Sequence, residues 1–155
     1  MLFKALLLDL DGTVRHGGDP CPNKPEDVKI YSDVMEKLRY FKAKDYKILG
    51  VSNQACVGLG MMSKEMARLI MHKTNELMGY IFDEIVYCPH RPDEGCACRK
   101  PQPGMIFYLA VKHDLDLPKC LMVGDLDSDK GAAFAAGVPF EAADKFFGRK
   151  KEWKR

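Results

Sequence analysis

The sequence predicts an α/β fold of three layers, in which helices cover both faces of a parallel β-sheet. Short apolar runs recur along the chain, as expected for strands buried on both faces, and they span residues 2–8, 46–51, 85–87, 120–123 and 138–140. Segments with helical patterning alternate with these runs, at residues 33–44, 63–78, 105–113 and 128–136. This alternation is typical of a parallel sheet, because parallel neighbours need a long crossover connection.

The ends of two predicted helices carry capping residues. Asp33 and Glu36 have the spacing of a capping box at the start of the first helix. Ser63 can cap the second helix, and Gly79 can end it. Before the first helix lies a loop rich in glycine and proline at 12–25. The segment between the first two strands therefore holds one loop and one helix, which is too little for a separate cap domain.

Length and composition predict one domain, residues 1–155, because a 155-residue chain with 46% hydrophobic residues can fill a single core. A formal net charge of +2 does not favour a nucleic-acid partner, which usually needs a strongly basic face. The short basic run at 149–155 is expected to be a solvated end. No apolar run approaches the roughly 20 residues that cross a bilayer, and residues 1–10 lack a small-residue cleavage site. We expect a cytoplasmic monomer with no membrane partner.

Two clusters of acidic residues follow two of the predicted strands. Asp9 and Asp11 come directly after the first strand, where Gly12 permits a sharp turn, and Asp125 and Asp129 come after the fourth. Ligands of such sheets bind at the carboxyl ends of the strands. Several carboxylates at one point need a cation, and oxygen ligands suit Mg²⁺, so we predict a magnesium site formed by Asp9, Asp11 and Asp125. The alternative is that these residues only form turns and helix caps.

Two further segments can complete a phosphate-binding site. Ser52 and Asn53 follow the second strand and offer a hydroxyl, an amide and main-chain donors. Arg99 and Lys100 precede a predicted helix and offer fixed cations. Each pair alone is weak evidence, but together with the acidic clusters these four residues predict a phosphate site. A carboxylate that attacks a phosphoryl group meets strong repulsion, which magnesium and a lysine offset.

A cysteine-rich loop at 88–98 predicts a metal site of a different kind. Three thiols and one imidazole fall within eleven residues, and these ligands suit tetrahedral zinc in a closed structural site: Cys88, His90, Cys96 and Cys98. The alternative is a set of ordinary loop cysteines among prolines. Of the remaining cysteines, Cys120 is expected in the core, and Cys21 and Cys56 are expected to be unpaired loop thiols.

The chain resembles the haloacid-dehalogenase (HAD) superfamily of phosphatases over residues 3–138, through four motifs in order: DLDGT, VSN, RKP and VGDLDSD. The resemblance implies a Rossmann-like fold, with Asp9 as the nucleophile and Asp11 as the general acid and base. It further implies phosphoryl binding by Ser52 and Lys100, magnesium binding by the nucleophile with Asp125, and a supporting role for Asp129.

The segment YCPHRPDEGCACRKPQPGM resembles a zinc-containing subgroup, the heptose-bisphosphate and histidinol-phosphate phosphatases. In that subgroup the zinc holds the loop leading to the third motif, which implies that zinc here fixes Arg99 and Lys100. Heptose-bisphosphate phosphatases also carry a substrate arginine in the loop of the second motif, where this chain has Leu59.

These patterns predict a magnesium-dependent phosphomonoester hydrolase that acts through an aspartyl-phosphate on a small phosphorylated metabolite. A D-glycero-D-manno-heptose 1,7-bisphosphate 7-phosphatase or another sugar-phosphate phosphatase of carbohydrate metabolism is the leading prediction. The alternatives are a histidinol-phosphatase, a polynucleotide 3′-phosphatase and a non-catalytic interaction module stabilised by zinc. The presence of every motif residue speaks against the last of these.

Overall fold

A sheet of five parallel strands forms the centre of the computed structural model, which describes residues 1–18 and 21–150. The described strands are β1 (Ala5–Leu8), β2 (Lys47–Asn53), β3 (Glu84–Cys88), β4 (Leu121–Gly124) and β5 (Phe140–Ala142). They lie in the order β3-β2-β1-β4-β5, so the first strand is the central one. The predicted α/β fold with a parallel sheet is confirmed.

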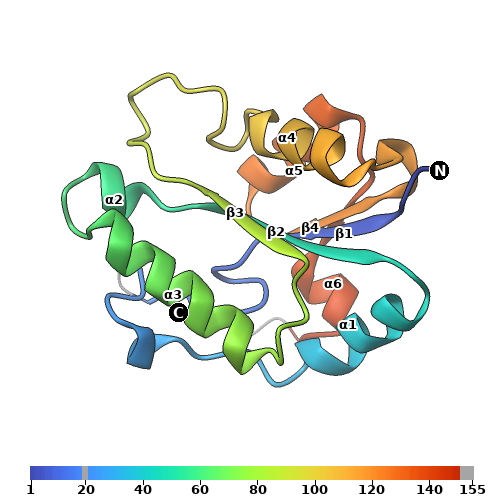
Figure 1. The fold of residues 1–155 in the computed structure, drawn as a ribbon, viewed down its shortest axis with the longest axis horizontal. Coiled ribbons are helices and arrows are strands. Elements are labelled where there is room, and N and C mark those ends of the chain that lie inside the picture. Colours follow the sequence, from blue (N-terminus) through green and yellow to red (C-terminus); the bar gives the residue numbers. More distant parts are fainter. Residues whose placement is uncertain (19–20, 151–155) are drawn as a thin grey trace.

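Helices cover both faces of this sheet (Figure 1). One face carries α4 (Gly104–His113) and α5 (Asp127–Ala136), and the other carries α1 (Val34–Ala43), α3 (Lys64–Leu77) and α6 (Ala143–Phe147). Successive residues of a strand point to opposite faces. In β1, Leu7 packs into the core under α4 and α5, while Leu6 and Leu8 pack into the core under the other three helices. Each fully buried leucine of this kind stabilises the fold by about 1.5–3 kcal/mol.

The predicted elements agree with the observed ones to within a few residues, but short elements were missed. The helix α2 (Ala55–Gly58) and α6 have four and five residues, too few to show a helical period. The 3₁₀ turns η1 (Pro25–Asp27) and η2 (Leu117–Lys119) are shorter still. Between β1 and β2 the described residues form only η1 and α1, as expected for a chain without a cap domain. No helix among the described residues is long and apolar enough to cross a membrane.

Ser63 caps α3 as predicted, since its Oγ accepts a hydrogen bond from the main-chain N–H of Met66 at 3.0 Å. The prediction of a capping box at the start of α1 is wrong, because the Asp33 side chain makes no cap hydrogen bond. Its carboxylate instead binds Arg149, whose Nε lies 2.7 Å from Oδ2. A charged partner from the far end of the chain outcompetes the local cap.

The contacts of Arg149 also show that the basic run does not begin as the solvated end that was predicted. Its guanidinium lies 4.1 Å over the ring of Tyr31 and donates to the main-chain oxygens of Gly12 and Thr13. Arg149 therefore fastens the end of the described chain to the turn after β1. Lys150 is exposed, and residues 151–155 of the predicted basic run lie outside the described residues.

A disulfide joins Cys21, in the loop after β1, to Cys56 in α2. The prediction that these two cysteines are unpaired thiols is wrong, because folding brings together two loops that are 35 residues apart in sequence. Both cysteines are buried in a small hydrophobic cluster with Val28, which directly follows η1, and with residues of α3. The bond ties the loop after β1 to the loop after β2, and both loops border the candidate site.

Candidate active site

The two acidic clusters meet at the carboxyl edge of the sheet because β1 and β4 are paired neighbours. Leu8, the last residue of β1, is in register with Val123 of β4. The main-chain N–H of Asp9 extends this ladder by donating to the oxygen of Val123 at 3.0 Å. Asp125 follows β4 at the same edge. The two acid-bearing strands are therefore adjacent in the sheet.

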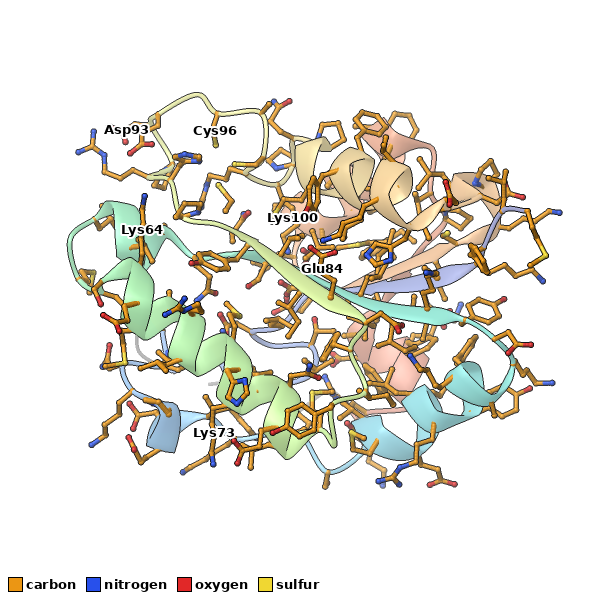
Figure 2. All side chains as sticks on the ribbon, viewed as in Figure 1. Lys64, Lys73, Glu84, Asp93, Cys96 and Lys100 are labelled. Atoms are coloured by element: carbon orange, nitrogen blue, oxygen red, sulfur yellow. A yellow bond between two sulfur atoms is a disulfide. The ribbon has the colours of Figure 1, made fainter. Side chains whose placement is uncertain are left out.

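Lys100 links the two clusters from the loop that follows β3. Its Nζ lies 2.8 Å from Oδ1 of Asp9 and 2.6 Å from Oδ1 of Asp129, and it donates to the oxygen of Val51 at 2.7 Å. Lys100, Asp9 and Asp129 are all buried. Figure 2 shows Lys100 where the loop returns to the sheet, close to the start of α4. One ammonium group thus contacts the side chains of both acidic clusters and the main chain of β2.

The electrostatics of this contact favour the charged lysine. Burial alone lowers the pKa of the Lys100 ammonium, but the carboxylates of Asp9 and Asp129 outweigh it and raise that pKa above its usual range. Breaking such a buried pair by removing one partner is strongly destabilising, because the remaining charge is left uncompensated. Lys100 is therefore a fixed cation beside the oxygen of Asp9.

Asp129 organises the turn after β4. Its Oδ2 accepts hydrogen bonds from the main-chain N–H groups of Asp125 and Leu126, each at 3.1 Å. Together with the Lys100 contact, these bonds engage both oxygens of the Asp129 carboxylate. Asp9 accepts fewer hydrogen bonds, one from Lys100 and a longer one of 3.3 Å from the hydroxyl of Thr13.

The carboxylates of Asp9, Asp125 and Asp129 can converge on one ion, since one oxygen of each lies within 4.8 Å of the others. Desolvation, and after it the neighbouring Asp9, raises the pKa of Asp125 to about 8. Three carboxylates against one ammonium leave an excess of negative charge that a divalent cation can offset. The donor set of oxygens alone fits Mg²⁺.

Glycines make this close approach possible. Gly12 has a φ of +83°, and a Cβ at this position would overlap the carboxylate of Asp125. At Gly124 a Cβ would overlap the side chain of Asp129. Gly12 therefore lets the first acidic loop approach the second, and Gly124 lets the Asp129 side chain fold back onto the end of β4.

Asp11 does not join this cluster. Its Oδ1 accepts from Nε of Arg15 at 2.7 Å, and its Oδ2 lies 3.4 Å from Nη2 of the same guanidinium. Asp11 is not among the carboxylates whose oxygens lie within 4.8 Å of one another, so magnesium binding by Asp11 stays a prediction. Burial raises the pKa of Asp11, and the charge of Arg15 opposes that rise. Arg15 is fully buried, and nothing in the sequence distinguishes it from a surface arginine.

The residues of the second motif have different partners from those expected. The side-chain amide of Asn53 makes two hydrogen bonds to the main chain of Lys100, at 3.0 and 3.1 Å. The Asn53 side chain therefore holds the main chain of the lysine, and a contact of Asn53 with phosphate stays a prediction. Ser52 is buried at the end of β2, with Oγ 3.0 Å from the side-chain amide of Gln54. Gln54 is a buried site residue that the sequence analysis missed.

The four predicted zinc ligands come together in the loop after β3. Among the thiol and imidazole atoms, the contacts run from 3.0 Å for Cys98 with Cys88 to 3.6 Å for Cys88 with Cys96. The Nδ1 atom of His90 lies 3.1 Å from the sulfur of Cys98. Ligands at the usual zinc distances stand about 3.3–3.8 Å apart around a tetrahedral ion. The cluster therefore has the composition and size of a zinc site, and Figure 2 shows Cys96 out on this loop.

The cysteine cluster is connected directly to the cations of the third motif. The main-chain N–H of Arg99 points at the sulfur of Cys96 at 3.4 Å. Arg99 also lines a pocket of about 440 Å³ together with Lys100 and residues of the cysteine loop. Its Nη1 is buried and has no hydrogen-bond partner in the part of the chain that the structure describes. The acidic residues do not line this pocket, so a shared approach of Arg99 and Lys100 to one phosphate remains a prediction.

Comparison with known proteins identifies the family. The family model described as "Polynucleotide kinase 3 phosphatase" matches residues 4–151. A D-glycero-beta-D-manno-heptose-1,7-bisphosphate 7-phosphatase of Helicobacter pylori is 34% identical over 139 residues, which cover 87% of this chain and 80% of the relative. The chain is a phosphatase of the HAD superfamily.

Solved structures of HAD phosphatases agree with the fold. The D,D-heptose 1,7-bisphosphate phosphatase of Bordetella bronchiseptica, complexed with magnesium and phosphate, has a TM-score of 0.82 and 30% identity. That match covers 89% of this chain and 79% of the other. A HAD-superfamily hydrolase of Geobacter sulfurreducens, 16% identical with a TM-score of 0.62, shares the fold over 89% of this chain and 88% of its own. This HAD phosphatase is thus close in sequence to heptose-bisphosphate phosphatases.

Proposed function

We propose that this HAD phosphatase hydrolyses phosphomonoesters with the help of Mg²⁺, through an aspartyl-phosphate on Asp9. The observation that carries the proposal is the buried contact of Lys100 with Asp9 at the carboxyl edge of the sheet. A lysine held against a carboxylate oxygen offsets the repulsion between that carboxylate and an incoming phosphate. The cluster needs this help, because Asp9 stands beside two other acidic residues.

Asp9 and Asp125 are the residues that would hold the magnesium ion. Asp129 is engaged by Lys100 and by two main-chain N–H groups, so it serves to orient the others. When bound, Mg²⁺ supplies positive charge that lowers the cost of bringing a phosphoryl group to the carboxylates. The relative from Bordetella bronchiseptica was solved with magnesium and phosphate, which supports this assignment.

The reaction has two steps that this chain's own residues can perform. Oxygen of the Asp9 carboxylate attacks phosphorus, the bond to the leaving oxygen breaks, and Asp11 gives its proton to that oxygen. Asp11 then takes a proton from water, whose oxygen attacks the phosphoryl group and releases Asp9. Lys100 stays beside Asp9 throughout, and Ser52 lies at the same strand edge to receive a phosphoryl oxygen.

We further propose a structural zinc ion held by the cysteine cluster. The short contacts among the four ligand side chains support it, as does the donor set of three thiols and one imidazole. Its effect on activity is indirect: by fixing Cys96 and Cys98, it fixes the following residues Arg99 and Lys100.

The leading substrate is a heptose 1,7-bisphosphate or a related sugar phosphate. Relatives at about a third identity with this activity support it, and the unpartnered Nη1 of Arg99 offers a donor for a second polar group of the substrate. A second candidate is a 3′-phosphorylated DNA end, because the matching family model carries a polynucleotide phosphatase description. The near-neutral net charge of +2 favours the sugar phosphate, since polyanions bind best to strongly basic surfaces.

A substrate panel tests the proposal. Phosphate release is measured with magnesium for heptose 1,7-bisphosphate, histidinol phosphate and an oligonucleotide with a 3′-phosphate, each with and without a chelator. We expect the highest kcat/KM for the heptose bisphosphate and loss of all activity with the chelator. Preference for the oligonucleotide would make a 3′-phosphorylated DNA end the substrate in place of a sugar phosphate. Full activity without a divalent ion would refute the magnesium dependence.

A further inference from the structure

Arg15 is the most deeply buried charged side chain outside the four motifs. It is 0% exposed, and it follows the first motif by two residues. Burying a guanidinium is costly unless its donors are paired, so its partners must account for its presence. In the part of the chain that the structure describes, Asp11 is the one carboxylate that contacts it.

The contact with Asp11 is directional. Nε of Arg15 donates to Oδ1 at 2.7 Å, a short charge-assisted hydrogen bond, whereas the contact of Nη2 with Oδ2 is long at 3.4 Å. In the amide orientation that satisfies its neighbours, the side-chain nitrogen of Gln54 lies 3.0 Å from Oδ2 and can donate to it. The carboxyl group is thus pinned firmly through Oδ1 and more loosely through Oδ2.

Arg15 is itself held by a helix on the far side. Its Nη1 donates to Oγ1 of Thr74 at 2.8 Å, and this fully buried hydroxyl donates in turn to the main-chain oxygen of Ile70 in α3. The guanidinium therefore connects the α3 helix to the carboxyl group of Asp11 and cannot rotate without breaking both hydrogen bonds.

We propose that Arg15 is a positioning residue that holds Oδ1 of Asp11, so that Oδ2 carries the proton to and from the reacting oxygen. The inference rests on the proposed role of Asp11 as general acid and base. In the first step the bond from phosphorus to the leaving oxygen breaks, its electron pair stays on that oxygen, and the proton on Oδ2 moves to it. A carboxyl group that rotates freely delivers this proton less often, because general catalysis depends on geometry before basicity.

Leaving groups of different basicity separate this role from a purely structural one. Phenyl phosphate and 4-nitrophenyl phosphate have similar shape, but the nitrophenolate is stable enough to depart without a proton. The measured quantity is kcat/KM, which reports on phosphoryl transfer to the enzyme and not on the later hydrolysis. Loss of proton delivery slows the phenyl ester more than the nitrophenyl ester, whereas a general loss of folded protein slows both alike.

We expect Arg15→Met to lower kcat/KM for phenyl phosphate by about 10²–10³-fold and for 4-nitrophenyl phosphate by less than about tenfold. Thr74→Val keeps the arginine but removes its anchor, and it should shift the ratio of the two constants in the same direction by about three- to tenfold. Arg15→Lys, which keeps the charge, should give a ratio of the two constants between that of the parent and that of Arg15→Met. The matched control is Arg39→Met, an exposed arginine of α1, which should leave the ratio unchanged.

A ratio in Thr74→Val that is unchanged from the parent overturns the inference, even if Arg15→Met fails to fold. Failure of the proposed function has a different signature. In that case the parent protein itself releases no phosphate from either ester, or releases it equally well with Asn at position 9. An active parent with equal losses on both esters leaves the proposed function intact and reduces Arg15 to a structural link between α3 and the first loop.

Discussion

The carboxylate site and the cysteine cluster lie on the same side of the molecule but are built in opposite ways. Lys100 is 91 residues from Asp9 and 29 residues from Asp129 along the chain, so their contact exists only after the sheet has formed. The cysteine cluster lies within one loop, where Cys88 and Cys98 are ten residues apart. The first site is a product of the fold, and the second can be assembled locally around a metal ion.

The two regions meet at residues 98–100, where the last cysteine ligand is followed by the two cations. Lys100 is approached from one side by the cysteine loop and from the other by Asn53, whose amide holds its main chain. The difference teaches that Lys100 depends on both regions. The sheet supplies its ion-pair partners and, through Asn53, holds its main chain, and the cysteine loop leads the chain into that position.

Replacement of Lys100 should abolish the activity of the carboxylate site. Lys100→Met leaves Asp9 and Asp129 facing each other without a cation, so we expect loss of turnover. Without magnesium, we also expect the free energy of unfolding to fall by about 3–5 kcal/mol. Phosphate release and urea unfolding measure the two effects. Lys64→Met, an exposed lysine of α3, is the control and should change neither. Activity within twofold of the parent would contradict the role given to Lys100.

Loss of one cysteine of the cluster should directly abolish metal binding by the loop, and should indirectly lower the activity of the carboxylate site. Cys98→Ser should lose zinc, lower the melting temperature by at least about 5 °C and reduce activity, since metal binding is coupled to ordering of the loop. Added magnesium should not restore the activity of this variant. Elemental analysis, thermal unfolding and phosphate release are measured beside Cys120→Ser, a buried thiol outside the cluster that should keep its zinc. A zinc-free parent that is folded and active would rule the zinc site out.

The smallest expected effect concerns Arg99, which lies between the two regions. A second phosphate on the substrate should gain one charge-assisted contact from this guanidinium, worth about 1.5–3 kcal/mol. Arg99→Ala should therefore lower the ratio of kcat/KM for a bisphosphate over its monophosphate by about ten- to two-hundredfold. Arg91→Ala, an exposed arginine of the same loop paired with Asp93, is the control. An equal ratio in the parent and in Arg99→Ala would make Arg99 an ordinary loop cation.

Much of the fold could be predicted from the sequence, because the strands of a buried parallel sheet are apolar throughout and the helices between them are long. The acidic clusters could be placed near one another for the same reason, since both follow such strands. The cysteine cluster could be predicted equally well, because its three cysteines and one histidine are close in sequence.

The partners of individual side chains could not be predicted. Arg15, Thr74 and Gln54 are polar residues at buried positions, and their sequence contexts are those of ordinary surface residues. Asn53 was placed in the correct loop, but the contact of its amide with a main-chain segment 47 residues away could not be foreseen. The bond between Cys21 and Cys56 and the ion pair of Arg149 with Asp33 likewise join segments whose proximity exists only in the folded chain.

The covalent intermediate on Asp9 tests the account most directly. During turnover of a phosphorylated substrate with magnesium, borohydride is added to reduce any acyl phosphate, and the peptide that contains the first motif is analysed by mass spectrometry. We predict that Asp9, and not Asp11 or Asp125, is converted to homoserine, that the product requires substrate, and that Asp9→Asn gives neither product nor turnover. Full activity of Asp9→Asn, or reduction at another aspartate, would contradict a mechanism built on Asp9.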